Sequence, residues 1–313
     1  MDVGSVIAGV LTGDRRAIAR AISMVEDSGT DLEALSAGIY ASTGRAWTIG
    51  LTGAPGVGKS TLATELVRAE RDAERTVAVL AIDPTSPYTG GALLGDRVRM
   101  QEHATDPGVF IRSMATRGHL GGMALAAPEA VRVLDAAGYD EIVVETVGVG
   151  QAEVEVAAAT DTAVVVLAPG MGDAVQMAKA GILEIADVFV VNKDDRDGAG
   201  DVIRELRQML HLGAARPWEP PILRTSALER KGLVELRAAI AEHRTFLDDS
   251  GALLAKRRAR LLREVESLAA ARFRVKAALV LTTDGELADD LVSRRVDPYR
   301  AAAILAGETA AAG

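Results

Sequence analysis

The chain has 313 residues, 49% of them hydrophobic and 3% aromatic, with 35 Lys and Arg against 44 Asp and Glu, a net charge of −9. This length and hydrophobic content allow one large domain with smaller additions. The acidic balance argues against nonspecific nucleic-acid binding, which needs basic surface. There is no cysteine, so disulfides, thiolate catalysis and cysteine-ligated metals are excluded.

The amino terminus lacks the features of a targeting segment. Residues 1–5 have neither the basic flank nor the apolar stretch of a secretion signal, and no run approaches the length of a membrane span. These patterns predict a cytoplasmic protein that does not bind membranes.

Residues 5–42 have a helical pattern and predict an amino-terminal cap, assigned to residues 1–45. A second short helix is expected from Leu32 to Tyr40. The first helix has an apolar stripe at helical spacing, which consists of Ala17, Ile18, Ala21, Ile22 and Val25.

Strand-like and helical runs alternate through residues 46–249. Because aromatic residues are scarce, the core must be aliphatic, which suits parallel strands covered by helices on both faces. The alternation predicts an α/β domain with a doubly wound, mainly parallel sheet. The expected strands are 47–52, 77–82, 109–112, 141–145, 163–168, 187–191 and 221–225.

A phosphate-binding loop follows the first of these strands. Residues 53–60 read Gly-Ala-Pro-Gly-Val-Gly-Lys-Ser, a complete GxxxxGK[ST] pattern between a buried strand and an amphipathic helix. Its backbone N–H groups can surround a phosphate, Lys59 can neutralise the β and γ phosphates, and Ser60 can ligate Mg²⁺. The expected binding residues are Gly53, Ala54, Pro55, Gly56, Val57, Gly58, Lys59, Ser60 and Thr61.

A guanine-recognition pattern, NKxD, follows the strand at 187–191. An isolated NKxD is more often a solvated loop, but here Asn192, Lys193 and Asp195 lie at the carboxyl edge of the predicted sheet. The Asp195 carboxylate can accept both N1–H and N2–H of guanine, and Lys193 can lie along the purine face. A third guanine element is expected at Thr225, Ser226, Ala227 and Leu228, where a backbone N–H could reach O6. The two motifs together predict a GTP-binding protein.

Hydrolysis of GTP needs acidic groups near the γ-phosphate, to hold Mg²⁺ or orient water. Asp83 and Glu145 follow predicted strands, although each could instead be a simple strand-end cap. Asp96 lies in a glycine-rich stretch and could equally be an ordinary loop acid. Gly148 can offer its N–H to the γ-phosphate. We therefore expect Lys59, Asp83, Asp96 and Glu145 to be catalytic, and Ser60 with the three acids to form the metal site.

Residues 250–313 predict a helical extension. An apolar seam there could pair with another helix or pack back on its own domain. Lys256, Arg257, Arg258 and Arg260 are expected to form its solvated face. The seam consists of Leu254, Leu261, Val265, Leu268, Val275 and Leu279.

Four stretches closely resemble the methylmalonyl-CoA mutase-associated GTPases, the MeaB/MMAA type also labelled ArgK-like. They are residues 83–91, 94–100, 112–122 and 145–151, and the resemblance extends over nearly the whole chain to Asp297-Pro298-Tyr299. It implies a homodimeric G-protein chaperone, with GTP or GDP and Mg²⁺ as cofactors and a dimerising carboxyl-terminal extension. It also implies an adenosylcobalamin-dependent acyl-CoA mutase as partner, whose cofactor loading the chaperone gates and which it protects or reactivates.

The resemblance further implies a mobile relay at residues 168–179, where Lys179 could pair across an interface or be an ordinary exposed lysine. His119 could move with a switch or be a hydrogen-bonded loop histidine. Two other functions share parts of the pattern. A metallochaperone GTPase would need a Cys/His cluster that a cysteine-free chain cannot supply. A transport-linked ATPase or kinase would have no use for a guanine-reading Asp195.

Overall fold

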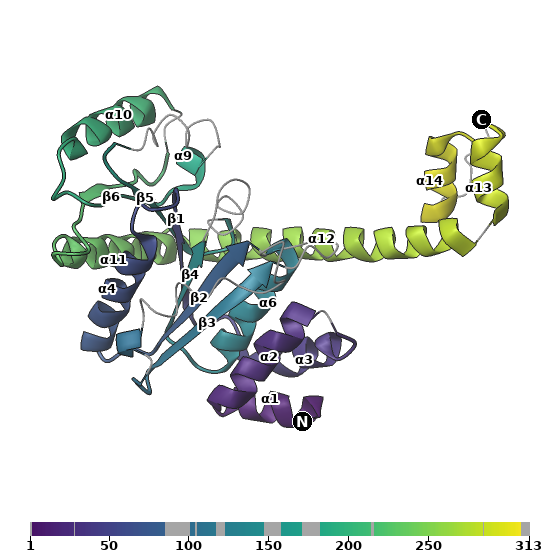
Figure 1. Ribbon diagram of the computed structural model, residues 1–313, viewed down its shortest axis with the longest axis horizontal. Coiled ribbons are helices and arrows are strands. Elements are labelled where there is room, and N and C mark those ends of the chain that lie inside the picture. Colours follow the sequence, from purple (N-terminus) through teal and green to yellow (C-terminus); the bar gives the residue numbers. More distant parts are fainter. Residues whose placement is uncertain are drawn as a thin grey trace. The chain divides into compact units, whose positions relative to one another are not determined.

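The computed structural model describes residues 2–27, 29–84, 101–103, 105–116, 123–146, 158–170, 182–213, 216–283 and 285–307. The chain divides into two compact units, Met1–Arg260 and Leu261–Gly313, and the boundary falls within one long helix. Figure 1 labels the elements.

The strands are β1 (Trp47–Thr52), β2 (Val77–Pro84), β3 (Val109–Thr116), β4 (Glu141–Thr146), β5 (Thr162–Leu167), β6 (Val188–Val191) and β7 (Ile222–Arg224). The helices of the first unit are α1 (Val3–Leu11), α2 (Arg15–Asp27), α3 (Leu32–Ile39), α4 (Lys59–Asp72), α6 (Met123–Ala136), α9 (Ile182–Ile185), α10 (Ala199–Leu212) and α11 (Leu233–Asp249), with 3₁₀ turns η1 (Tyr40–Ser42) and η2 (Gln101–His103). The remaining helices are α12 (Ala252–Thr283), α13 (Gly285–Val292) and α14 (Pro298–Ala306).

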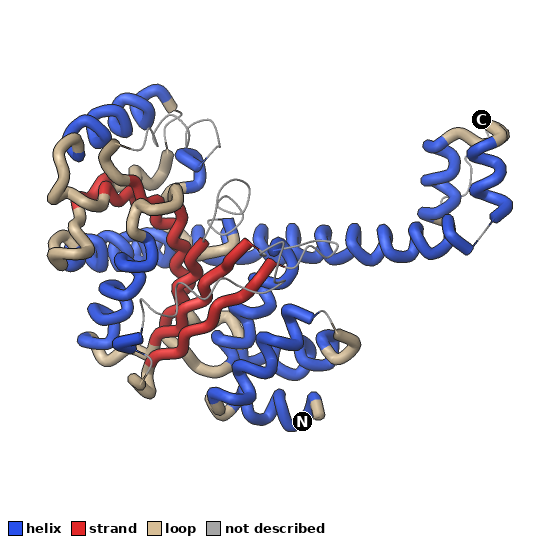
Figure 2. Tube along the Cα trace, in the orientation of Figure 1, coloured by secondary structure: helices blue, strands red, loops and turns tan. Residues whose placement is uncertain are grey.

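The sheet confirms the predicted fold class. Its seven strands have the order β3-β2-β4-β1-β5-β6-β7, and every pair of neighbours is parallel. Each of the seven predicted runs forms one strand. The largest difference is at β3, which continues to Thr116 because β2 and β3 stay paired as far as Pro84 and Thr116. Figure 2 shows the strands passing between helical layers.

Helices cover both faces of the sheet, as a doubly wound fold requires. On one face, α4 and α11 bury Leu66 and Ile240 against β1 residues such as Ile49. On the other face, α2 and α6 pack on β2 and β4, while α10 packs on β5 and β6. The carboxyl edge of the sheet stays available for loops that bind ligands.

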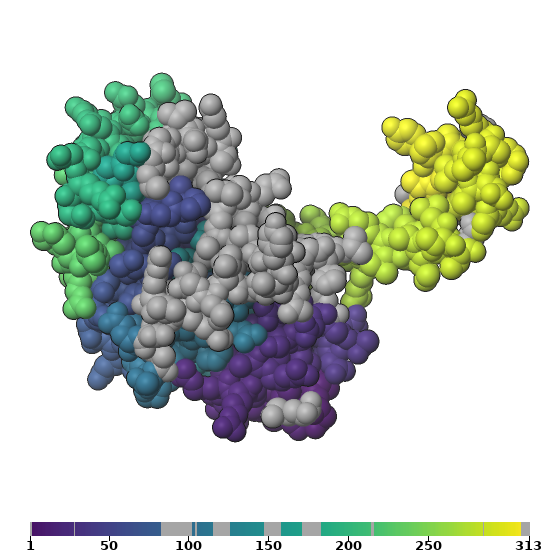
Figure 3. All heavy atoms as spheres, in the orientation of Figure 1, coloured from purple at the N-terminus to yellow at the C-terminus, as the bar shows by residue number. Residues whose placement is uncertain are grey.

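The amino-terminal cap is helical, as predicted, and covers the edge strand β3. Arg112 of β3 donates from Nη2 to Glu26 Oε2 at 2.8 Å on α2. Arg15 donates from Nη1 to the Val109 carbonyl at 2.6 Å, which satisfies an acceptor on an otherwise open sheet edge. In Figure 3 the cap and α10 lie at opposite ends of the first unit. The cap therefore closes one side of the sheet.

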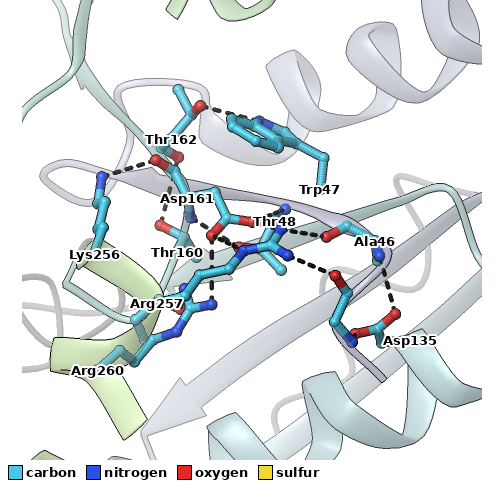
Figure 4. A network of polar contacts seen from close by, with 12 residues as sticks. Ala46, Trp47, Thr48, Asp135, Thr160, Asp161, Thr162, Lys256, Arg257 and Arg260 are labelled. Carbon is cyan, nitrogen blue, oxygen red and sulfur yellow. Dashed lines mark hydrogen bonds and ion pairs between the residues drawn. The ribbon is translucent and has the colours of Figure 1, made fainter. Parts of the chain in front are cut away.

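The first turns of α12 belong to the core of the first unit, and the predicted solvated face is wrong for Lys256, Arg257 and Arg260 (Figure 4). Arg257 contacts the fully buried Asp161 through Nε at 3.1 Å and Nη2 at 2.7 Å. Lys256 donates to Asp187 at 2.9 Å, and Arg260 donates to the Ala159 carbonyl at 2.8 Å. Only Arg258 of the predicted set is exposed.

This error has a physical cause. Burial disfavours the charged form of Asp161, but hydrogen bonding to Arg257 and the charges of Arg260 and Arg257 lower its pKa below the ordinary value. The carboxylate lies 96 residues before Arg257. No periodicity within a helix can reveal so distant a partner.

In the second unit, α13 and α14 pack together with Leu287 and Ala301 buried. Asp297 caps α14, because its Oδ1 accepts from the backbone N–H groups of Tyr299 and Arg300. Among the described residues, no helix has the length and apolar character needed to cross a membrane. Large apolar side chains along the α12 part of this unit are exposed, among them Leu262, Val265, Val275 and Leu279.

Candidate nucleotide site

The phosphate loop connects β1 to α4 in a conformation that only glycine tolerates at two positions. Gly53 has φ of 143°, and a Cβ there would lie 2.1 Å from the Val166 carbonyl oxygen on β5. Gly58 has φ of 99°, and a Cβ there would lie 2.5 Å from Asn192 Nδ2. The first glycine lets the loop pass close to the sheet. The second makes room for the NKxD motif.

Lys59 and Ser60 begin α4, and both are buried. Lys59 Nζ donates to the carbonyls of Gly53 at 2.5 Å and Ala54 at 3.0 Å. Its ammonium group therefore lies over the loop, where a phosphate would compete with these carbonyls for it.

Ser60 Oγ donates to Glu145 Oε1 at 2.7 Å. Glu145 is 1% exposed and lies near the end of β4, the strand beside β1. The structure thus brings together two of the four predicted metal ligands, a hydroxyl and a carboxylate. Both are oxygen ligands of the kind that Mg²⁺ prefers, so these residues fit the ion.

Asn192 joins the two predicted binding motifs. Its buried side chain donates from Nδ2 to the Val57 carbonyl at 2.9 Å in the phosphate loop. Its Oδ1 accepts from Thr225 Oγ1 at 3.0 Å and from the Ala227 N–H at 3.1 Å. One amide therefore positions the phosphate loop and the loop after β7. The sequence placed Thr225 in the expected guanine element but gave no signal that its hydroxyl would donate to Asn192, 33 residues earlier.

Lys193 and Asp195 also contact the two neighbouring loops. Lys193 adopts φ of 60°, and its Nζ donates to the Gly56 carbonyl at 2.5 Å. Asp195 is exposed, and its Oδ1 accepts from Ser226 Oγ at 2.8 Å. This hydrogen bond restrains the Asp195 carboxylate beside the loop after β7.

The structure describes only part of the remaining predicted site residues. The backbone of Asp83 belongs to β2 and pairs with Ala115 at the same edge of the sheet. The side chain of Asp83 lies outside the described parts of the chain. The same is true of four whole residues, Asp96, Gly148, His119 and Lys179. Within those parts, no group of three or more acidic or histidine side chains could hold a metal ion.

Comparison with known proteins assigns this arrangement to a family. The sequence profile described as Methylmalonyl Co-A mutase-associated GTPase MeaB matches residues 18–279. The chain belongs to this GTPase family. Its phosphate loop, NKxD motif and seven-stranded parallel sheet are therefore parts of a P-loop GTPase.

Relatives of the MeaB-family chain include a Pyrococcus horikoshii protein named as a GTPase, 49% identical and aligned over 93% of each chain. GTPase ArgK of Escherichia coli strain K12 is 40% identical over 77% of this chain and 76% of its own. The Caenorhabditis elegans protein named Methylmalonic aciduria type A homolog, mitochondrial, is 36% identical over 82% of this chain and 69% of its own.

A crystal structure titled LAO/AO transport system kinase has the same fold over 97% of this chain and 96% of its own. Its TM-score is 0.72 and its sequence identity 28%. The similarity therefore extends beyond the nucleotide-binding sheet to the helical additions.

Proposed function

We propose that this MeaB-family GTPase binds GTP, GDP and Mg²⁺ at the carboxyl edge of its sheet and uses hydrolysis to switch conformation. The contacts of Asn192 carry the proposal, because one buried amide holds the phosphate loop and the loop of Ala227 in a common frame. In this proposal the ligand spans both loops, with its phosphates in the first and its base against the second. A guanine nucleotide has this form.

The base would be read by Asp195, with Lys193 along the purine face and a backbone N–H of residues 226–228 at O6. Asp195 is an acceptor, and its link to Ser226 supports this role. Adenine offers no matching pair of donors. We therefore expect GTP and GDP to bind much more tightly than ATP, which direct calorimetric titration of the three nucleotides measures. Equal affinity for ATP and GTP would contradict the proposal.

Mg²⁺ would be held by Ser60, with Glu145, Asp83 and Asp96 as ligands of the ion or of its waters. The bound ion would neutralise charge that develops on the γ-phosphate. The hydrogen bond from Ser60 to Glu145 supports this set. Lys59 would bind the β and γ phosphates, and the Gly148 N–H would contact the γ-phosphate.

The proposed partner is an adenosylcobalamin-dependent acyl-CoA mutase, and specifically methylmalonyl-CoA mutase. The family description names that mutase, and the Caenorhabditis elegans relative is named after methylmalonic aciduria. In this function the GTPase gates cofactor loading and protects or reactivates the mutase, and the γ-phosphate and Mg²⁺ provide the contacts that differ between states.

The partner is tested by calorimetric titration of purified methylmalonyl-CoA mutase into the GDP-bound form and into a form bound to non-hydrolysable GTP. Coupling is reciprocal, so the two affinities should differ by roughly 1–3 kcal/mol if the mutase changes nucleotide affinity by that amount. Hydrolysis should also accelerate in the complex. Failure to bind in either state would leave the GTPase assignment intact and remove this mutase as partner.

A second candidate is a transport-linked kinase, because the similar crystal structure carries that title. A kinase would transfer the γ-phosphoryl group to a protein or small-molecule acceptor, whereas a GTPase transfers it to water. Incubation with γ-labelled GTP separates these outcomes, since only a kinase moves the label to an acceptor other than water.

A homodimer held by the extension is also proposed. Exposed apolar side chains along α12 beyond Arg260 support it, since such a surface is commonly covered by a partner. Truncation at Ser250 would not test the dimer alone, because it would also remove Lys256 from the partly buried Asp187 and Arg257 from the buried Asp161. Substitution of the exposed apolar residues leaves that junction in place.

A further inference from the structure

The loop after β7, residues 225–232, is closed by its own backbone. Ser226 and Lys231 exchange two hydrogen bonds, from the Ser226 N–H at 3.1 Å and the Lys231 N–H at 3.0 Å. Gly232 ends the loop with φ of 75°, where a Cβ would lie 2.0 Å from the Arg224 carbonyl oxygen. These contacts fix the shape of the loop. They do not fix its distance from the helix that carries Lys59.

Arg230, at the tip of this loop, reaches that helix. Its backbone has φ of 58°, a left-handed conformation that costs energy in any residue other than glycine. Its Nε lies 3.3 Å from Glu65 Oε2 on α4, one turn beyond Ser60. The Glu65 side chain is 9% exposed and also accepts from Arg68 Nη1 at 2.7 Å. The buried carboxylate is therefore shared by two arginines, of which Arg230 is 61% exposed.

A second contact of the same kind lies further along α4. Arg237 of α11 donates from Nε to Glu70 Oε1 at 2.9 Å, and the Glu70 side chain is 4% exposed. Two buried glutamates of α4 therefore receive one arginine from the loop and one from the helix that follows it. The pair at Glu70 joins the two helices. The pair at Glu65 joins α4 to the loop itself.

We propose that Glu65 and Arg230 are positioning residues for base recognition. Asn192 holds this loop at Thr225 and Ala227, and the ion pair adds a second anchor between the Arg230 end of the loop and α4. The two anchors together keep the groups that contact the base at a constant distance from Lys59 and Ser60. The inference deepens the proposed guanine-nucleotide site and depends on it. Neither side chain touches the nucleotide in this role.

Arg230→Met tests the proposal, with GTP and GDP as base-containing ligands and inorganic triphosphate as a base-free ligand. A partly exposed ion pair is worth up to about 1 kcal/mol, so the Kd values of GTP and GDP should rise by roughly two- to fivefold. The Kd of triphosphate, competed against labelled GDP, should stay unchanged. KM for GTP should rise while kcat stays constant.

Glu65→Gln should raise the same two Kd values, and the double variant should be no weaker than the worse single variant. Arg230→Lys should restore part of the affinity. The control is Arg237→Met, which removes an equal charge from the matching ion pair with Glu70, the pair that joins α4 to α11 rather than to the loop. This control should bind both nucleotides like the wild type.

Wild-type GTP affinity in Arg230→Met would overturn the proposal. Equal weakening of GTP and triphosphate would also overturn it, because the pair would then support α4 rather than base recognition. Asp195→Asn separates this failure from a failure of the guanine site. If that variant loses guanine preference while Arg230→Met changes nothing, only the positioning role is wrong.

Discussion

Glu141 should make the stability of the protein depend on pH, and Glu141→Gln should remove that dependence. Glu141 begins β4, and its side chain is 4% exposed. Burial and the neighbouring Glu70 raise its pKa from 4.5 to about 7, although Arg75 opposes the shift. Arg75 Nη1 donates to one carboxylate oxygen at 2.5 Å, and the other, Oε2, is buried without a hydrogen-bond partner.

The sign follows from the proton balance. Between pH 4.5 and about 7 the native state keeps the Glu141 proton while the unfolded state loses it, so the free energy of unfolding falls as pH rises. Above pH 7 both states are ionised and the loss is complete. The pKa of Glu141 differs by about 2.5 units between the two states. At about 1.36 kcal/mol per unit, the free energy of unfolding falls by about 3 kcal/mol.

Urea unfolding of wild type and Glu141→Gln at pH 5, 6, 7 and 8, followed by tryptophan fluorescence, measures the effect. The variant should be about 2–3 kcal/mol more stable than wild type at pH 8 and nearly equal to it near pH 5. Glu74→Gln is the matched control, because Glu74 is exposed and close in sequence to Arg75. A constant difference between Glu141→Gln and wild type over this range would refute the reasoning.

Four further outcomes are expected. Asp195→Asn should exchange GTP for XTP preference, because the amide presents a donor to guanine N–H groups; titration with both nucleotides checks this. Arg257→Met should lower the free energy of unfolding by about 3–5 kcal/mol, since it strips a buried carboxylate of its main partner; the exposed Arg258→Met should be neutral in the same urea titration. Glu145→Ala should lower kcat by ~10²-fold with a smaller change in GTP affinity, which steady-state hydrolysis measures. Val265→Glu should convert the proposed dimer to monomer in light scattering, and a persistent dimer would move the interface elsewhere.

The sequence by itself determined the features whose cause is local. A phosphate loop between a strand and a helix needs glycines and a lysine at fixed spacing, so residues 53–60 could be recognised before any fold was known. The seven strands were predictable for a similar reason, because parallel strands buried on both faces are continuous aliphatic runs. The sequence also placed Asn192 at the carboxyl edge of the sheet, because this residue directly follows a predicted parallel strand.

The tertiary structure decided which polar groups meet across the chain. The helical pattern around Arg257 gave no sign of its ion pair with Asp161, and the sequence around Glu141 gave no sign that burial and the neighbouring Glu70 would raise its pKa. Arg230 likewise pairs with Glu65 on α4, 165 positions earlier in the chain. The physical reason is common to all three. Periodicity reports burial along one element, whereas the charge partner of a buried group depends on how distant elements pack.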